Sequence, residues 1–336
     1  MSTFNKIYKY SRIWILLIVA ILLPKWVPNR YYQGVVNTAL IFAILSMSLN
    51  TLSGCTGLFC VGFVAFYGIG AYGAAILATR YGWPLLLCLL AGGVISMAFS
   101  LLLGLPTMRL RGMYFAVATL AFGEIMYQLF VNWVSLTGGS NGIKSIPSPN
   151  WFGISFRKPE NYYYILLAAA VITIILTRNL INSRPGRAML SIRENDIAAE
   201  AMGVDVPKYK MLAFAASTFF AGVAGGLFAF YARYIDPTSF VNAESSAILA
   251  MMVVGGIGSI SGSFIGGLVL SILPEMMRFL GNIRLVLYGL AVVVIIIFAP
   301  KGIGGLIEHI DGVLCGTIKT GQQRKDDPEA HAEVKE

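Results

Sequence analysis

Long runs of apolar residues, separated by short breaks rich in Gly, Pro and charged residues, fill most of the chain between residues 13 and 299. A bilayer core of roughly 30 Å takes about 20 helical residues to cross, so each run predicts a transmembrane helix. The runs are too long and continuous for the alternating strands of about 10 residues that build an outer-membrane barrel. We therefore expect an all-α, polytopic membrane protein with about ten crossings, at residues 13–28, 31–52, 58–79, 84–105, 113–134, 162–176, 211–231, 246–258, 264–280 and 285–299.

The eighth expected crossing, 246–258, is too short to span the bilayer comfortably and ends in glycines. This pattern predicts a broken or re-entrant element. Counted from an inside N-terminus, crossings two to five start outside and crossings seven to ten start inside, which is the arrangement of an inverted repeat. Each set contains a glycine-rich stretch, at 53–73 and at 253–267. The two stretches together predict an inverted repeat.

Glycines in these stretches have two interpretations. Small residues let helices approach closely, and glycine breaks in corresponding halves of a transporter mark a translocation path near the midplane. Close packing is the simpler explanation for any single glycine, whereas the serines after residue 258 favour a polar path in the second stretch. The candidate path residues from the two stretches are Gly68, Gly70, Gly255, Gly256, Gly258 and Ser259.

Charge distinguishes the two sides of the membrane. The chain is 57% hydrophobic and 12% charged, with a net charge of +9. Cytoplasmic loops of membrane proteins carry excess Lys and Arg, so this surplus does not indicate nucleic-acid binding. With the N-terminus inside, the expected inner segments hold 16 of the 25 Lys and Arg residues. We therefore expect both termini and the 178–210 segment to be cytoplasmic.

The chain divides into two parts by composition. Residues 1–312 carry the apolar runs and form the expected transmembrane domain, with 178–210 as its long inner loop. Residues 313–336 are polar and lack apolar periodicity, which is typical of a disordered tail.

The 178–210 segment is the long charged stretch between apolar runs. Within it, residues 193–202 predict a short helix, with Glu194 and Asp196 in the first turn, where the helix dipole favours acidic groups. Gly203 follows as a left-handed cap. The small apolar face of this helix suits a groove on another protein, but it also suits the membrane surface. Spacing alone leaves both interpretations open.

Glu124 lies in the middle of the expected crossing 113–134. A charge at the centre of a transmembrane helix costs about 2.5–3.5 kcal/mol on insertion scales, so it usually faces a cavity or a partner. Glu124 is therefore either a carboxylate on the translocation path or a structural group hydrogen-bonded to a neighbouring helix. The sequence does not decide between them.

Enzymatic chemistry has little support in the sequence. The four cysteines follow no metal-ligand spacing, and the two histidines lie near or in the polar tail. Buried cysteine usually behaves as a small hydrophobe. The chain also lacks the G-x-x-x-x-G-K-[ST] phosphate loop, so it does not bind ATP by that device. We expect a transport protein without catalytic residues, metal or cofactor.

Several ordered motifs resemble the branched-chain amino acid permease family, in its LivM-type branch. They include GFVAFYGIGAYGAAIL at 62–77, LTGGSNGI at 136–143, AAEAMGVDVPKYKMLAF at 198–214 and VVGGIGSISGSFIGG at 253–267. The resemblance extends from about residue 50 to residue 305. Members of the family often carry His where this chain has Phe63, which weakens the case for polar chemistry at that position.

The resemblance implies the membrane subunit of a type II ABC importer in a bacterial inner membrane. Its partners would be a second permease subunit, two ABC ATPase subunits and an extracytoplasmic substrate-binding protein, with membrane lipid around them. The 193–203 segment would couple to the ATPases. The residues that the resemblance places in this coupling segment are Arg193, Glu194, Asp196, Glu200, Ala201 and Gly203.

Branched-chain amino acids are the cargo that the resemblance implies. Urea, short amides or other amino acids are alternatives within the same family. A proton-coupled secondary transporter that uses Glu124 as its relay is an alternative of a different class. It predicts uptake by the chain alone under a pH gradient.

Overall fold

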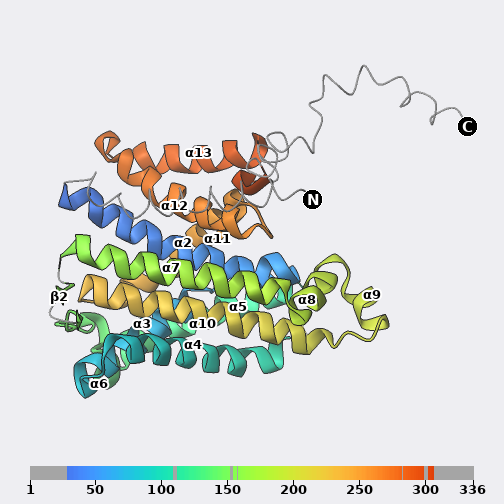
Figure 1. The fold of residues 1–336 in the computed structure, drawn as a ribbon, viewed down its shortest axis with the longest axis horizontal. Coiled ribbons are helices and arrows are strands. Elements are labelled where there is room, and N and C mark those ends of the chain that lie inside the picture. Colours follow the sequence, from blue (N-terminus) through green and yellow to red (C-terminus); the bar gives the residue numbers. More distant parts are fainter. Residues whose placement is uncertain are drawn as a thin grey trace, which may run out of the picture.

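The computed structural model describes residues 29–108, 112–151, 154–156, 158–281, 283–298 and 302–305. These residues form a bundle of helices whose long axes run roughly side by side, with a small hairpin of strands β1 (Asn150–Trp151) and β2 (Ile154–Ser155) at one end (Figure 1). The expected all-α class is confirmed. The expected first crossing, 13–28, and the expected tail, 313–336, lie outside the described residues.

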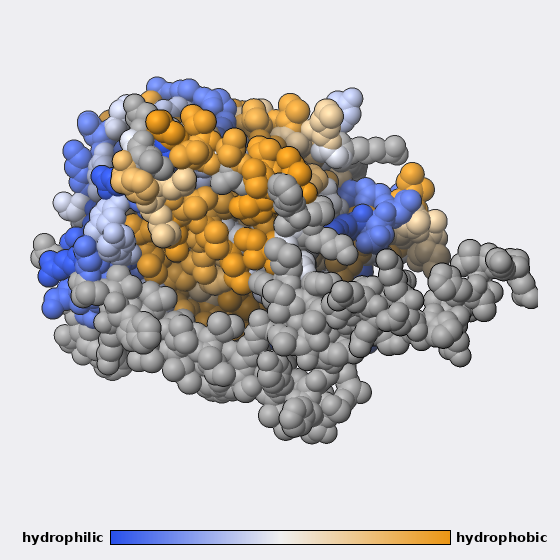
Figure 2. Space-filling view, turned by 90° about the horizontal axis from the view of Figure 1, so that it is seen from above, coloured by the Kyte–Doolittle hydropathy of each residue, from blue (hydrophilic) through white to orange (hydrophobic). Residues whose placement is uncertain are grey.

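Five helices are long and apolar enough to cross a membrane: α2 (Arg30–Thr56), α4 (Leu85–Thr107), α5 (Met113–Asn132), α7 (Pro159–Asn182) and α10 (Val206–Ala232). The shorter apolar helices are α3 (Val64–Tyr81), α11 (Asn242–Gly255), α12 (Ile260–Met276) and α13 (Ile283–Phe298). Each of the nine expected crossings inside the described residues therefore coincides with a helix. Figure 2 shows a broad apolar surface with hydrophilic residues at its two ends, as a multi-pass membrane protein requires.

Short elements connect these helices. At the end of the bundle that carries β1 and β2 lie α6 (Val134–Thr137) and the 3-10 turn η1 (Gly139–Asn141). At the opposite end, α8 (Arg184–Glu194) and α9 (Asp196–Ala201) project beyond the long helices (Figure 1). Two further 3-10 turns, η2 (Pro237–Phe240) and η3 (Arg278–Leu280), flank α11 and α12.

Helices α2 and α10 form the core of the bundle. In their most apolar windows, 78% and 67% of residues are buried, against 22–33% in α4, α5 and α7. The outer helices therefore keep apolar faces for lipid or for a partner. Helix α10 packs along α3 and α4, and α2 packs along α12.

The packing fits an inverted repeat of α2–α5 and α10–α13. Helix α2 lies against α12 as α10 lies against α4, and α11 packs on α12 as α3 packs on α4. A diglycine stands at a comparable place in α4 and α12: Gly93 packs under Phe219 of α10, and Gly267 packs against Ala43 of α2. The diglycines of α4 and α12 are therefore a better-matched pair than stretches 53–73 and 253–267, whose pairing stays a prediction.

Two crossings are broken near the middle of the bundle. Helix α3 begins only at Val64, after a non-helical approach from the end of α2, and α11 begins at Asn242, after η2. Both starts lie beside Gly123, halfway along α5: an added Cβ there would overlap the Asn242 side chain and lie 3.3 Å from the Gly62 Cα. The short eighth crossing is thus a broken element, as its length predicts.

Candidate translocation path and coupling helix

The starts of α3 and α11 meet through polar side chains. The Val64 backbone N–H donates to the Ser245 hydroxyl at 2.8 Å, and the Val61 N–H donates to the Thr119 hydroxyl of α5 at 3.1 Å. Helix N-termini carry unpaired N–H groups and a partial positive charge. Two of them converging at mid-bundle make a polar point inside an apolar protein, the arrangement that transporters use near the midplane. Ser245 and Thr119 gave no sequence signal, because isolated hydroxyl residues are common in apolar helices.

Glu124 lies beside this point. Its carboxylate accepts hydrogen bonds from the Asn242 side-chain amide of α11 and from the Gln128 amide one turn along α5, both at 3.2 Å. The side chain is also exposed on the surface of the isolated chain. Both interpretations of Glu124 thus find support: it bonds to a neighbouring helix, and it faces outward toward whatever covers α5. The contact with Gln128 could have been predicted from the spacing of four residues on one helix, whereas the contact with Asn242 could not, because that residue is 118 positions away.

The face of α5 that carries Glu124 is apolar apart from the exposed Gln128. Its exposed large apolar side chains include Met113, Tyr114, Val117, Leu120 and Ile125, with exposed fractions from 44% to 80%. A carboxylate at the centre of such a stripe is expensive in lipid. The stripe is therefore suited to a protein partner or an aqueous path beside Glu124.

Three of the candidate path glycines allow close packing. An added Cβ at Gly70 would overlap the backbone of Gly222 in α10, and one at Gly68 would lie 2.8 Å from the Phe130 ring. Gly255 similarly meets the backbone of α12, 2.6 Å from the Ser263 Cα. Gly70 and Gly255 thus allow backbones to approach, and Gly68 makes room for aromatic rings, which is the simpler of the two interpretations.

The other candidate path residues form the turn between α11 and α12. Gly256 and Gly258 have φ of +111° and +90°, a region that side chains rarely adopt. Ser259 caps α12 by accepting from the Gly262 N–H at 3.2 Å. Each of these residues therefore has a local structural role, and a role on the path stays a prediction.

The predicted short helix differs from the observed one at its start. Helix α9 begins at Asp196, and Arg193 and Glu194 belong to the last turn of α8. The break is set by Asn195, which has extended backbone and accepts from the Ile197 and Ala198 N–H groups at 3.0 and 3.1 Å. Asparagine is among the best N-cap residues, so the predicted start at residue 193 was wrong and a start after Asn195 was predictable. Gly203 has φ of +82°, which confirms the expected left-handed cap.

Helix α9 is fastened to the bundle at its base. The Lys210 ammonium of α10 donates to the Asp196 carboxylate at 2.5 Å, and Lys210 is only 4% exposed. Ala199 packs in a small apolar cluster with Ile192 of α8 and Val206 of α10. A cap, an ion pair and an apolar cluster thus hold α8, α9 and the start of α10 together. We call residues 184–210 the handle.

The tip of the handle is exposed. Ile197 and Met202 are 68% and 85% exposed, and Glu200, Ala201 and Gly203 beside them are exposed as well. Figure 2 shows hydrophilic residues next to apolar ones at this end of the molecule. The exposed apolar side chains of Ile197 and Met202, with the Glu200 carboxylate beside them, suit a groove on a partner protein.

Arg193 points in the opposite direction. Its guanidinium Nη1 donates to the Gly54 carbonyl in the last turn of α2 at 2.8 Å. The expected coupling residues therefore separate into a group at the tip, Glu200, Ala201 and Gly203, and a group whose side chains bond to the bundle, Arg193 and Asp196, although Arg193 is itself exposed. Glu194 is exposed at the end of α8.

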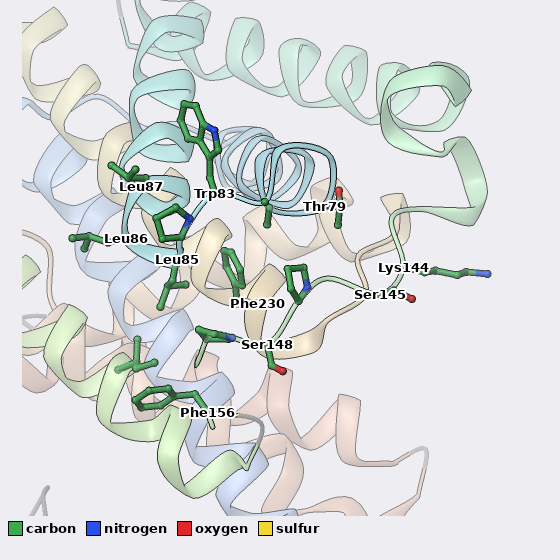
Figure 3. Close-up of a pocket in the computed structure, with 16 residues that line it drawn as sticks. Thr79, Trp83, Leu85, Leu86, Leu87, Lys144, Ser145, Ser148, Phe156 and Phe230 are labelled. Atoms are coloured by element: carbon green, nitrogen blue, oxygen red, sulfur yellow. The ribbon is translucent and has the colours of Figure 1, made fainter. Parts of the chain in front are cut away.

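An apolar cavity of about 800 Å³ lies at the other end of the bundle, between the start of α4 and the loop before β1. Figure 3 shows Trp83, Leu85 and Phe230 along its wall, with Lys144 pointing away from them. It contains none of the predicted site residues. Its lining lacks converging charged groups, so it does not resemble a site for a zwitterionic ligand.

Comparison with known proteins identifies the family. Residues 31–299 match the family described as "Branched-chain amino acid transport system / permease component". The high-affinity branched-chain amino acid transport system permease protein LivM of Salmonella typhimurium is 34% identical over 86% of this chain and 73% of its own length. LivM of Escherichia coli K12 matches to the same extent.

Two further likenesses are weaker. LivH of Salmonella typhimurium, another permease protein of such a system, is 27% identical over 60% of this chain and 62% of its own length. The solved structure of PsaBC from Streptococcus pneumoniae in complex with Fab aligns at a TM-score of 0.44 with 14% identity, over 80% of this chain and 92% of that chain. The family match covers most of the transmembrane bundle described above. The chain therefore belongs to the permease component family of branched-chain amino acid transport systems.

Proposed function

We propose that this chain is one of two membrane subunits of an ATP-driven importer for branched-chain amino acids. The family supplies the transport role, and the LivM relatives are named for this class of cargo. The observation that carries the proposal is the structure of the handle. It is a helical projection that is bonded to the bundle at its base and exposed to solvent at its tip. Such a projection lets another protein pull on a membrane domain.

The partner at the tip is an ABC ATPase subunit in this proposal. The sequence has no G-x-x-x-x-G-K-[ST] loop of its own, so ATP binding by that device falls to partners. Ile197 and Met202 enter a groove on the ATPase, with Glu200, Ala201 and Gly203 at its rim. In this proposal the handle faces the cytoplasm, and the expectation that both termini are cytoplasmic stays a prediction.

The second membrane subunit covers α5. Glu124 then borders the path between the two subunits, beside the converging starts of α3 and α11. Relatives named LivM and LivH support such a pair of permeases. The substrate-binding protein docks on the opposite, extracytoplasmic end and selects the cargo.

Reconstitution tests the proposal. The chain is purified in mild detergent together with the proteins that remain bound to it. This complex is reconstituted into liposomes and supplied with the substrate-binding protein. ATP is added on the side of the membrane that the handle faces. We expect ATP-dependent accumulation of labelled leucine, reduced by excess isoleucine or valine. Competition by urea or a short amide instead would assign the cargo to the alternatives within the family.

The chain alone provides the opposing test. Uptake by the purified chain under a pH gradient without ATP would contradict the importer and support a proton-coupled transporter with Glu124 as its relay. We expect no uptake in that experiment.

A further inference from the structure

A hydrogen-bonded junction joins the handle to the turn between α11 and α12. Arg193 bonds from the last turn of α8 to the Gly54 carbonyl at the end of α2. The last carbonyls of a helix lack intrahelical partners and carry partial negative charge, so a guanidinium binds there favourably. The same guanidinium lies against Gly258, where an added Cβ would overlap its Nη1 atom. Arg193 therefore contacts both α2 and the α11–α12 turn.

Asn50 completes the junction from inside the bundle. It is 2% exposed, and its side-chain oxygen accepts from the Gly258 N–H at 2.8 Å. Its amide nitrogen donates to the Ser259 carbonyl at 3.0 Å and to the Ser263 hydroxyl at 3.2 Å. All of these bonds from α2 go to the α11–α12 turn and the start of α12. A buried amide with its bonds satisfied holds the groups it joins in one arrangement.

Helix α11 connects this junction with the middle of the bundle. Its 14 residues span about 21 Å at 1.5 Å per residue. At its far end, Asn242 bonds to Glu124 and Ser245 bonds to Val64 at the start of α3. A helix is stiff over this length, so a displacement of the α11–α12 turn moves the Glu124 contact as well.

We propose that Arg193 and Asn50 form a mechanical link through which movement of the handle reaches α11 and the point where α3 and α11 begin. Arg193 is then a positioning residue that acts inside the membrane domain, and it does not touch the motor. The inference rests on the proposed function, because it requires an ATPase that moves the handle. It departs from the expectation that Arg193 belongs to the motor-facing surface.

The chain offers a matched control on the same helix. Arg187 of α8 is exposed, and its guanidinium bonds only locally in the structure, to the Asn182 carbonyl at 3.2 Å. Arg193→Gln and Arg187→Gln each remove one positive charge from α8. Only the first breaks the contact with Gly54 and Gly258.

The test uses the reconstituted complex and measures three quantities: bound ATPase subunits, ATP hydrolysis and amino acid uptake. For Arg193→Gln we expect ATPase binding and hydrolysis within about twofold of wild type and uptake at least about tenfold lower, within the usual range of coupling between sites. Arg187→Gln should leave all three quantities within about twofold.

A second variant reaches the junction from the other side. Gly258→Ala keeps the Arg193 side chain but displaces its guanidinium, and it also strains the turn because Gly258 has φ of +90°. We expect the same division between hydrolysis and uptake, with some added loss from the strained turn. Because both changes break the contact between Arg193 and Gly258, the double variant should lose less uptake than the two single losses multiplied together.

Other outcomes would overturn the link. Unchanged uptake in Arg193→Gln would remove any role in transmission, and loss of bound ATPase would place Arg193 at the motor. Failure of both variants to assemble would show that the junction is only structural. These results leave wild-type uptake intact, whereas absence of ATP-driven uptake in the wild type would refute the proposed function itself.

Discussion

Lys210 illustrates how single residues hold the handle in place. Its ammonium is nearly fully buried and its charged partner is Asp196, whose side chain is 44% exposed. Removing one partner of a buried pair leaves a charge without compensation, whereas replacing both with apolar groups is often neutral. The pair therefore serves to fix the start of α9 against α10.

Asp196→Asn should loosen this anchor. We expect the α9 amides to exchange faster with deuterium, by an amount equivalent to about 1–3 kcal/mol, because Lys210 loses its counter-charge. Glu194→Gln, two residues away on an exposed carboxylate, is the control and should leave exchange unchanged. An equal effect of both variants would show that the overall charge of the handle matters and the ion pair does not.

Gly70 is a second position where a single residue holds the packing, because it has no Cβ atom where α3 meets α10. Gly70→Ala pushes a methyl group into the backbone of Gly222, and we expect a loss of about 1–3 kcal/mol in unfolding free energy. Gly289→Ala in α13 is the control, since an added Cβ there meets nothing within 4 Å. Both are measured by denaturant unfolding of the purified chain in detergent micelles. Equal stability of the two variants would contradict the close α3–α10 contact.

At the scale of elements, α9 is too short to be stable alone. A six-residue helix lies far below the roughly 12–15 residues that make an isolated helix even marginal in water. Its stability comes from Asn195 at the N-cap, Gly203 after the C-terminus and the cluster around Ala199. The tip of the handle is therefore rigid only while these local supports remain.

Asn195→Ala should consequently weaken α9 by about 0.5–2 kcal/mol, since the cap bonds to Ile197 and Ala198 are lost. Asn195→Gly should weaken the helix by only a few tenths of about 1 kcal/mol, because Gly is also favoured at the N-cap. Hydrogen exchange of residues 196–202 measures the effect. If Ala proves no worse than Gly, the side-chain cap is not what starts the helix.

The helices also show which parts of the structure could be predicted from the sequence. Apolar runs predicted the described crossings, because crossing length and hydropathy are local properties. The short run before Gly256 likewise predicted the broken eighth crossing. The start of α9 was missed although Asn195 signals it locally, and the inward turn of Arg193 was missed because its partners, Gly54 and Gly258, are remote in sequence.

At the scale of the whole molecule, the two half-bundles place the starts of α3 and α11 at one level, with Glu124 beside them. The handle and the α11–α12 turn lie together at one end of the bundle. Helix α11 runs between the two regions. The fold therefore provides a continuous connection from the handle to the middle of the membrane domain.

Glu124→Gln tests the middle of this connection. We expect amino acid uptake by the reconstituted complex to fall while assembly stays normal, because the carboxylate is replaced by a neutral group of the same shape. Gln128→Ala, one turn along α5, removes a hydrogen bond to Glu124 but keeps the charge, and it should have the smaller effect. Normal uptake by Glu124→Gln would leave the residue with a structural role only.

The proposed function requires that an ATPase subunit binds the tip of the handle. Photo-crosslinking in native membranes tests it, with a photoreactive amino acid at Met202 in one sample and at Glu194 in another. We predict that the Met202 probe forms a protein crosslink to an ATPase subunit and that the Glu194 probe forms less of it. Crosslinks from Met202 to lipid alone would show that α9 lies on the membrane surface, and they would contradict the account.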